Sequence, residues 1–449
     1  MKFKPYEEYK KVDLPWIDKI PSHWEMSRIK DSINYNTNGY WGEEPEGNKH
    51  DYICIRVADF DMKNYSVTKN KQLTKRNIRL DNNDRRFLEK GDLLIEKSGG
   101  GEKQPVGRVI QYNMKEKAVC SNFISKININ KKNINSKYVL FLLNNIWDTR
   151  HIMPYIKQTT GIQNLDDKSF FSNYIQIPPK EEQDKISDFL DYNLGKIDKF
   201  VELTERQIDL LKEQKEVIIN DAVTKGIDKN VEYKDSGIDW IGEIPAHWEV
   251  TRVKYLTNSS FLYGANESGI QYNEELPRYI RITDIDKNGT LKDTRKRSLS
   301  NEKSKGFLLK NGDVLFARSG ATVGKTFLYE YENDKACFAG YLIRFRPDFK
   351  EIVPRYLYLY TKSGLYKLWV QSIFIQSTIQ NISAERYKNL VITLPPKKQQ
   401  KEIVAYIEKE TSKIDRTIEL YKSQIELIKE YRTSLIASAV TGKIDVRNF

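Results

Sequence analysis

One stretch of this 449-residue chain has the spacing of a catalytic motif, and it lacks a residue that the chemistry needs. Residues 319–326, Ser-Gly-Ala-Thr-Val-Gly-Lys-Thr, are similar to a phosphate-binding loop, but Ser319 stands where that motif requires glycine. His23 and His247 each lie between a nearby proline and a tryptophan, which is typical of packed structural histidines. No paired carboxylates, zinc-ligand cluster or nucleophile triad stands out in the sequence. We therefore expect no catalytic residue, no metal site and no cofactor of its own.

Basic side chains gather at one place in each half of the chain. The net charge of +12 and the isoelectric point of about 9.1 favour a polyanionic partner, nucleic acid before membrane. A solvated loop is the alternative, but recurrence in two halves favours phosphate contact, where each cation releases counterions. The residues are Lys69, Lys71, Lys75, Arg76, Arg79, Arg85 and Arg86 in the first half, and Lys292, Arg295, Lys296, Arg297, Lys303 and Lys305 in the second.

Polar residues at predicted turns complete the candidate DNA-binding set. Their side chains and backbone N–H groups would add donors for a phosphate or a base. These residues are Arg56, Lys97, Ser98 and Arg108 in the first half, and Arg281, Arg318, Ser319 and Lys325 in the second. Gln163 and Gln380 carry amides that can read an adenine edge, or can equally tie their loop to the start of a helix, so both roles remain open.

The chain is an internal duplication. Residues 162–228 return without a gap as residues 379–445, at an offset of 217. Further upstream, the pattern Trp-Ile-x-x-Ile-Pro-x-His-Trp-Glu occurs at residues 16–25 and again at 240–249. The offset drifts from 225 to 217 in the earlier part of each repeat and is then constant. Because insertions collect in loops whereas packing fixes helix length, the constant part predicts a long helix.

Each repeat therefore predicts a globular α+β part followed by one long helix. The globular parts show short runs of β-branched and aromatic residues between Gly, Asn and Asp, which indicate strands and turns. Short helices are expected at about 136–146 and 354–362, and the long helices at about 181–223 and 398–440. The expected domains are residues 1–178, a central helix at 179–226, residues 227–395, and a C-terminal helix at 396–449.

Both predicted long helices carry apolar residues at alternating spacings of three and four. Two equal copies of such a stripe, with a whole domain between them, favour an antiparallel coiled coil with pseudo-two-fold symmetry. Lys215 and Arg432 interrupt the stripe at equivalent places, for register or for a packed partner. The stripe consists of Ile186, Leu190, Ile197, Val201, Ile208, Leu211, Ile218 and Ala222, and of Ile403, Ile407, Ile414, Ile418, Ile425, Ile428, Leu435 and Ala439.

Composition is typical of a chain with real hydrophobic cores. Hydrophobic residues make up 39% of it and aromatic residues 12%. The three cysteines are unclustered, so neither a disulfide framework nor a zinc site is expected, and Cys120 and Cys337 are interpreted as buried repeat equivalents. No apolar run approaches the length of a membrane span and the start has no apolar signal region, so we expect a cytoplasmic protein.

With these motifs in place, nearly the whole chain resembles the specificity subunit of Type I restriction–modification systems. The resemblance lies in the duplicated layout: a Trp-Ile-x-x-Ile-Pro-x-His-Trp-Glu opening, then Ile-Gln-Asn, Pro-Pro-Lys and a long helix. It implies two target recognition domains that each read one half of a bipartite, asymmetric DNA target, for defence against foreign DNA. It also implies that the paired helices set the spacer and seat two modification subunits.

The resemblance places the chemistry in partner subunits. S-adenosylmethionine and adenine methylation would belong to the modification subunits, and ATP, Mg and cleavage to restriction subunits. The half-sites would then lie about one turn apart, ~34 Å. Deleting one heptad from either helix is expected to change the spacer and neither half-site.

Three other interpretations remain. The chain could serve a modification-only or Type II-like assembly, or act as a coiled-coil scaffold that does not read DNA. It could also be a nuclease or methyltransferase with divergent motifs. Methylation by the purified chain alone would establish that enzyme, and loss of all salt-dependent DNA binding in the assembled complex would favour the scaffold.

Overall fold

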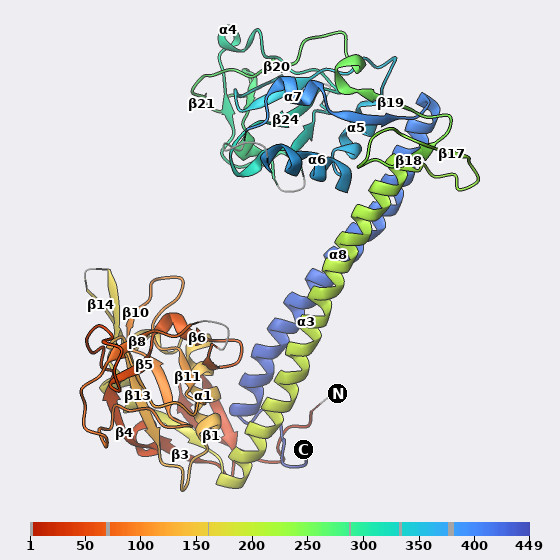
Figure 1. Ribbon diagram of the computed structural model, residues 1–449. Coiled ribbons are helices and arrows are strands. Elements are labelled where there is room, and N and C mark those ends of the chain that lie inside the picture. The colour runs from red at the N-terminus through yellow and green to blue at the C-terminus, as the bar shows by residue number, and fades with distance from the viewer. Residues whose placement is uncertain (1–2, 69–71, 160, 287–288, 332–334, 376–380) are drawn as a thin grey trace. The chain divides into compact units, whose positions relative to one another are not determined.

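The computed structural model describes residues 3–68, 72–159, 161–286, 289–331, 335–375 and 381–449 (Figure 1). It divides into two compact units, Met1–Leu203 with Ser423–Phe449, and Thr204–Lys422. Each unit holds one of the predicted globular parts. Each also holds the first half of the long helix that follows that part, and the second half of the other long helix.

The globular part of the first unit is built on small sheets and two short helices. Its largest sheet has the order β4 (Ile33–Asn38), β13 (Ile124–Ile129), β9 (Leu93–Glu96), β11 (Val109–Gln111), β7 (Ser66–Val67) and β6 (Phe60–Asp61). Two three-stranded sheets are β12 (Ala118–Cys120), β5 (Asp51–Ile55), β8 (Lys75–Asn77), and β10 (Ser98–Gly99), β15 (Ile162–Leu165), β14 (Ile156–Thr159). Strands β1 (Tyr9–Leu14) and β2 (Ile17–Pro21) pair, as do β3 (Glu25–Arg28) and β16 (Tyr174–Ile177). The helices are α1 (Ser136–Asp148) and α2 (Asp167–Phe171).

The globular part of the second unit repeats this plan. Its four-stranded sheets are β20 (Leu262–Tyr263), β27 (Leu342–Phe345), β24 (Val314–Ala317), β25 (Thr326–Leu328), and β21 (Ile270–Gln271), β23 (Arg297–Ser298), β22 (Arg278–Ile280), β26 (Ala336–Phe338). The paired strands are β17 (Tyr233–Asp235) with β18 (Glu243–Pro245), and β19 (Glu249–Arg252) with β28 (Val391–Leu394). The helices are α4 (Asn301–Ser304), α5 (Pro354–Tyr360), α6 (Gly364–Ile375) and α7 (Ala384–Lys388). The expected α+β class is confirmed, and α6 is a helix that the sequence pattern did not predict.

Strand register fixes which residues of the two copies correspond. The parallel pair β5–β12 places Cys54 opposite Val119, and the parallel pair β22–β26 places Tyr279 opposite Cys337. Cys54 and Tyr279 are repeat equivalents at the offset of 225, so the residues opposite them, Val119 and Cys337, are equivalent as well. Cys120 then corresponds to Phe338, at an offset of 218. The prediction that Cys120 and Cys337 are equivalent is wrong by one residue, because a loop difference precedes this strand. All three cysteines are free and buried, as expected.

The long helices are α3 (Lys180–Thr224) and α8 (Lys397–Val440), close to their predicted bounds. In the first unit, Ile186 and Leu190 of α3 share one core with Leu435 and Ala439 of α8. In the second unit, the roles are exchanged, and the end of α3 shares a core with the start of α8. Each unit thus packs the beginning of one helix against the end of the other, an antiparallel arrangement (Figure 1).

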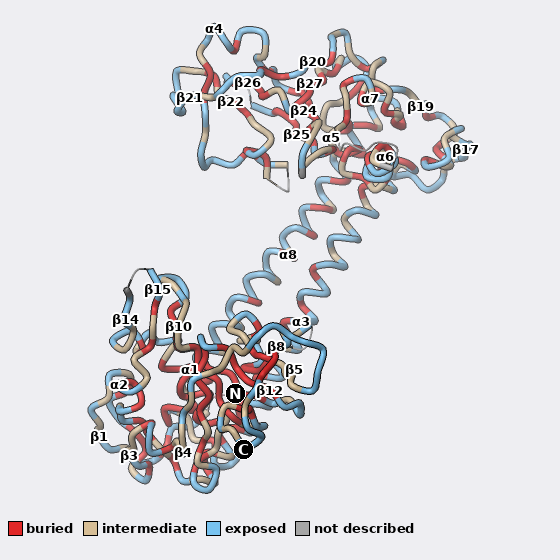
Figure 2. Tube along the Cα trace, turned by 60° about the vertical axis from the view of Figure 1, so that its left-hand side comes forward, coloured by how far each residue is buried: buried red, intermediate tan, exposed pale blue. Residues whose placement is uncertain are grey.

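Most of the predicted apolar stripe is buried along both helices, as Figure 2 shows by colour. Leu211, Ile218 and Ile428 are only half-buried, and Ile219 rather than Ile218 enters the core. Of the two interruptions, Lys215 forms an ion pair across the helices with Asp415, at 2.6 Å between Nζ and Oδ2. Arg432 instead lies on the ring of Tyr65 in the first globular part. Lys215 therefore links α3 to α8, and Arg432 links α8 to the first globular part.

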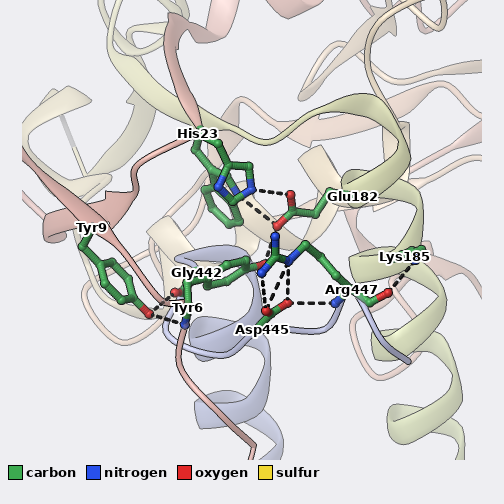
Figure 3. Close-up of polar contacts among 9 residues, drawn as sticks. Tyr6, Tyr9, His23, Glu182, Lys185, Gly442, Asp445 and Arg447 are labelled. Carbon is green, nitrogen blue, oxygen red and sulfur yellow. Dashed lines mark hydrogen bonds and ion pairs between the residues drawn. The ribbon is translucent and has the colours of Figure 1, made fainter.

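The two ends of the chain meet at the start of α3 (Figure 3). The backbone N–H of Asp445 donates to the Lys4 carbonyl at 2.8 Å, and the Tyr9 hydroxyl donates to the Gly442 carbonyl at 2.9 Å. The carboxylate of Glu182 accepts hydrogen bonds from the Tyr6 hydroxyl and from Trp24 Nε1, the latter at 2.9 Å.

The histidines lie at equivalent junctions in the two units. His23 Nε2 lies 2.8 Å from the carboxylate of Glu182. In the second unit, His247 lies 2.9 Å from Gln399 Oε1, which also accepts from Trp248 Nε1 at 2.8 Å. Both histidines have a polar contact with the start of a long helix, which fits the structural role that the sequence indicated, but both are exposed rather than packed inside the fold.

Candidate functional site

Three loops meet at one end of the first globular part. Strand β9 ends at Glu96, and the backbone N–H of the next residue, Lys97, donates to the carbonyl of Phe123 in the β12–β13 turn at 2.8 Å. The Lys97 carbonyl accepts from the N–H of Leu165 in β15 at 2.8 Å. Strand β10 then pairs with β15, so that Ser98 lies opposite Asn164. These hydrogen bonds join the predicted Lys-Ser-Gly turn, the Gln-Asn loop and a further turn into one edge.

The same three loops meet in the second globular part. The N–H of Arg318 donates to the Tyr341 carbonyl at 3.0 Å, and the Arg318 carbonyl accepts from Ile382 N–H at 2.8 Å. Ser319 forms an isolated bridge with Asn381, as Ser98 pairs with Asn164. The repeat has therefore preserved a backbone framework and not only a sequence pattern.

In each globular part, a basic side chain of this framework lies beside another side chain, which is polar in the first part and aromatic in the second. In the first part, Lys97 Nζ donates to Asn38 Oδ1 at 2.7 Å, and Ser98 Oγ donates to Asn164 Oδ1 at 2.5 Å. In the second, Arg318 lies over the ring of Tyr263, 4.7 Å from its centroid. We call the set Asn38, Lys97, Ser98, Phe123 and Asn164 edge 1, and the set Tyr263, Arg318, Ser319, Tyr341 and Asn381 edge 2.

Gln163 does not lie on the accessible surface of edge 1. Its side chain is buried, its Oε1 accepts from the backbone N–H of Val106 at 3.3 Å, and its Nε2 donates to Gln158 Oε1 at 3.5 Å. These contacts tie Gln163 to the loop at Val106 and to β14, and neither reaches the start of a helix, so the structural role expected from the sequence is not the one that the contacts show. Gln380 lies outside the described residues.

Several predicted basic residues are engaged inside their own domains. The Arg108 side chain is 13% exposed and lies against Glu96, with 2.8 Å between Nε and Oε2. Burial raises the pKa of the Glu96 carboxyl, although Arg108 opposes the shift. Arg76 is buried, stacks on Trp41 and pairs with Glu44. Arg76 and Arg108 thus neutralise or cover groups of their own fold, and their contact with DNA stays a prediction.

Arg56 and Arg281 have equivalent structural partners. Arg56 Nη2 lies 3.2 Å from Asp59, and Arg281 Nη2 lies 2.7 Å from Asp284. In both cases the carboxylate also accepts the arginine's own backbone N–H, which closes a 3₁₀ turn. The guanidinium groups thus hold the turn that follows β5 or β22, and both side chains stay about a third exposed, so their contact with DNA stays a prediction.

The remaining predicted basic residues are more exposed. Lys75, Arg295, Arg297 and Lys325 are exposed. Arg79 is exposed but pairs with Glu46, while Lys296 pairs with Asp293 and lies over Tyr272. Lys69 and Lys71 lie outside the described residues.

The phosphate-loop resemblance has no structural counterpart. A phosphate-binding loop leads from a strand into a helix, whereas residues 320–322 form a single 3₁₀ turn that leads into strand β25. Among the residues that the structure describes, no group of three or more His, Cys, Asp or Glu side chains is placed to hold a metal ion. No described helix is both long enough and apolar enough to cross a membrane.

The long helices carry a second candidate surface. On α3, Leu203, Leu210 and Val217 are spaced by seven residues and are more than half exposed. On α8, Leu420 and Leu427 occupy the equivalent positions and are also exposed. An apolar stripe at heptad spacing, left open beside the buried stripe, is the surface that a further helix would cover.

Comparisons with known proteins agree with this architecture. The family model described as Type I restriction modification DNA specificity domain matches residues 21–213 and again 246–430. The type I restriction enzyme MjaVIII specificity subunit of Methanocaldococcus jannaschii is 24% identical over 446 residues, which cover 96% of this chain and 95% of that protein. The type I restriction enzyme EcoBI specificity subunit of Escherichia coli is 24% identical over 293 residues, covering 63% of this chain and 61% of that protein.

Solved structures share the fold at low identity. A chain from a study of complex assembly and conformational transition of the type I R-M system has a TM-score of 0.72 at 16% identity, and the match covers 95% of this chain and 99% of that one. The HsdS subunit from Thermoanaerobacter tengcongensis has a TM-score of 0.55 at 16% identity, with 95% and 98% covered.

Proposed function

Because this chain belongs to the Type I restriction–modification DNA specificity family, we propose that it reads an asymmetric bipartite DNA target and scaffolds two modification subunits. The chain has two target recognition domains, and we assign them to the globular parts at residues 1–178 and 227–395. Each domain would read one half of the target through its edge. The helical segments 179–226 and 396–449 would set the distance between the halves.

The observation that carries the proposal is a common framework with different side chains. Edges 1 and 2 share their backbone hydrogen bonds and their serine and asparagine positions. They differ at the cation, where Lys97 stands against Arg318, and at its neighbour, where Asn38 stands against Tyr263. Two domains built alike but lined differently read two different half-sites, since base readout depends on side-chain donors and acceptors.

The exposed stripes on α3 and α8 support the scaffolding role. Each helix offers one stripe, and the stripes are repeat equivalents, so two copies of one partner would each find the same surface. The partners we propose are modification subunits, which supply S-adenosylmethionine and methylate adenine. Restriction subunits would add ATP- and Mg-dependent cleavage.

We further propose that this chain contributes recognition and no catalytic group. Edges 1 and 2 hold cations, amides, hydroxyls and aromatic rings, which bind DNA but do not transfer a methyl group. The expected division of labour places binding here and methyl transfer in the partner.

Co-expression with the modification subunit, followed by single-molecule sequencing of host DNA for N6-methyladenine, tests the proposal. We expect a split motif of two short, different halves around a fixed gap. The modification subunit expressed without this chain is the control and should give no such motif. A folded, bound complex that produces no bipartite methylation would contradict the proposed function.

A further inference from the structure

An exposed aromatic ring stands at the tip of the same β-turn in both recognition domains. The turn at residues 121–124 joins β12 to β13 and closes with Ile124 N–H donating to the Ser121 carbonyl at 2.9 Å. The turn at residues 339–342 joins β26 to β27 and closes in the same way, Leu342 to Ala339, at 2.9 Å. The residue at the third position is Phe123 in one and Tyr341 in the other.

Both rings are largely open to solvent. Phe123 is 52% exposed and Tyr341 is 63% exposed. A single exposed aromatic residue needs no explanation. An exposed ring that recurs at one topological position, while most of the surrounding strand residues are buried, indicates that the position is kept open for a contact.

The turn is fixed against the cation of each edge. The Phe123 carbonyl accepts from the N–H groups of Lys97 at 2.8 Å and Ser98 at 3.2 Å. The Tyr341 carbonyl accepts from the N–H of Arg318 at 3.0 Å. Each ring is therefore carried by a hydrogen-bonded turn directly beside a side chain of the proposed reading edge.

The two edges separate into positions that are the same and positions that differ. Ser98 and Asn164 bond each other, and their equivalents are again serine and asparagine. The ring position differs, phenylalanine against tyrosine, as do the cation and its neighbour. The serine and asparagine positions join the loops, by a side-chain hydrogen bond in edge 1 and by a backbone bridge in edge 2, and the residues that differ are those available to distinguish two DNA sequences.

We propose that Phe123 and Tyr341 are specificity-determining residues, each ring packing against the 5-methyl group of a thymine in the half-site that its domain reads. This inference rests on the proposed function. The thymine methyl is the apolar group that the major groove displays, and an aromatic ring is a suitable contact for it. The Tyr341 hydroxyl adds a hydrogen-bonding group that Phe123 lacks, so the two positions are not interchangeable.

The test uses the full chain assembled with its modification subunit and the target found by methylation sequencing. Duplexes carry deoxyuridine in place of each thymine in turn, which removes one methyl group and no hydrogen bond. We expect the wild-type complex to bind about fourfold more weakly when deoxyuridine replaces thymine at one position in each half-site, because one buried methyl is lost. Phe123→Ala should bind the intact target about tenfold more weakly and should no longer distinguish thymine from deoxyuridine at the position in the half-site that its domain reads.

Matched controls come from exposed aromatic residues elsewhere in each domain. Tyr174, 47% exposed on β16, is the control for Phe123, and Tyr255, 65% exposed, is the control for Tyr341. Tyr174→Ala and Tyr255→Ala should keep wild-type affinity and discrimination. Tyr341→Ala should lose discrimination in the other half-site only. All four changes are at the surface, where the fold tolerates substitution.

The inference is overturned if Phe123→Ala and Tyr341→Ala bind the intact target as tightly as wild type, or keep discrimination at every thymine. In that case the wild-type split motif still stands and the proposed function is unaffected. If the wild-type complex gives no split motif, the proposed function fails and the inference fails with it.

Discussion

Replacing Glu182 by alanine should loosen the junction where the chain ends meet α3. The carboxylate accepts from two buried donors, the Tyr6 hydroxyl and Trp24 Nε1, and from His23, whose side chain is 39% exposed. Water can replace the partner of His23 but not those of the buried donors. An orphaned buried donor costs about 1–3 kcal/mol, so Glu182→Ala should cost about 2–6 kcal/mol locally.

The second unit supplies matched controls for this prediction. There Gln399 accepts from Trp248, which is buried, and from His247. Glu182→Gln should therefore be mild, under about 1 kcal/mol, because an amide oxygen serves this site in the other copy. Gln399→Ala should cost about half as much as Glu182→Ala, since it orphans one buried donor instead of two.

Native-state hydrogen exchange read by mass spectrometry measures the effect by segment. With Glu182→Ala, protection in residues 3–24 and 442–449 should fall by about 30-fold or more, while peptides of the second unit keep theirs. Unchanged protection in those segments would refute the reasoning. Equal losses for Glu182→Gln and Glu182→Ala would show that the negative charge, and not hydrogen-bond satisfaction, holds the junction.

Three further predictions concern the helices and the second domain. Leu210→Glu or Leu427→Glu should weaken binding of the modification subunit about tenfold or more, as measured by isothermal titration. The control Glu213→Gln on α3 should leave binding unchanged. Equal binding by all three variants would exclude the exposed stripe as the binding surface. Removing one heptad from either long helix should change the gap of the methylated motif and leave both halves unchanged; an unchanged gap counts against the helices as spacer. Burial lowers the pKa of Lys362 to about 8, so from about pH 8 to 10.5 the unfolded chain holds a proton that the folded chain does not. The contribution of Lys362 to stability should therefore rise with pH in that window, and thermal unfolding of Lys362→Met should lack this contribution; an identical pH slope in both proteins would contradict it.

The sequence determined the parts of this protein that repeat or are periodic. Apolar residues at spacings of three and four, in a stretch where the two repeats keep a constant offset, predicted the ends of both long helices within a residue or two. The reason is that packing fixes the length of a helix and the face it buries. The Lys-Ser-Gly and Ile-Gln-Asn motifs identified loops that do meet at one edge. They were visible because the duplication supplied a second copy of each.

Only the tertiary structure decided which polar side chains are available at the surface. Arg76, Arg108 and Gln163 carry polar groups that suit a DNA contact, but in the fold Arg76 and Gln163 are buried and Arg108 is paired with Glu96, and no local pattern encodes those partners. Phe123 shows the reverse case, since in sequence it is one more aromatic residue in a strand-rich stretch, and only the turn that carries it leaves the ring exposed beside Lys97. Periodicity is a local property that the sequence displays directly, whereas availability depends on what the folded chain brings alongside.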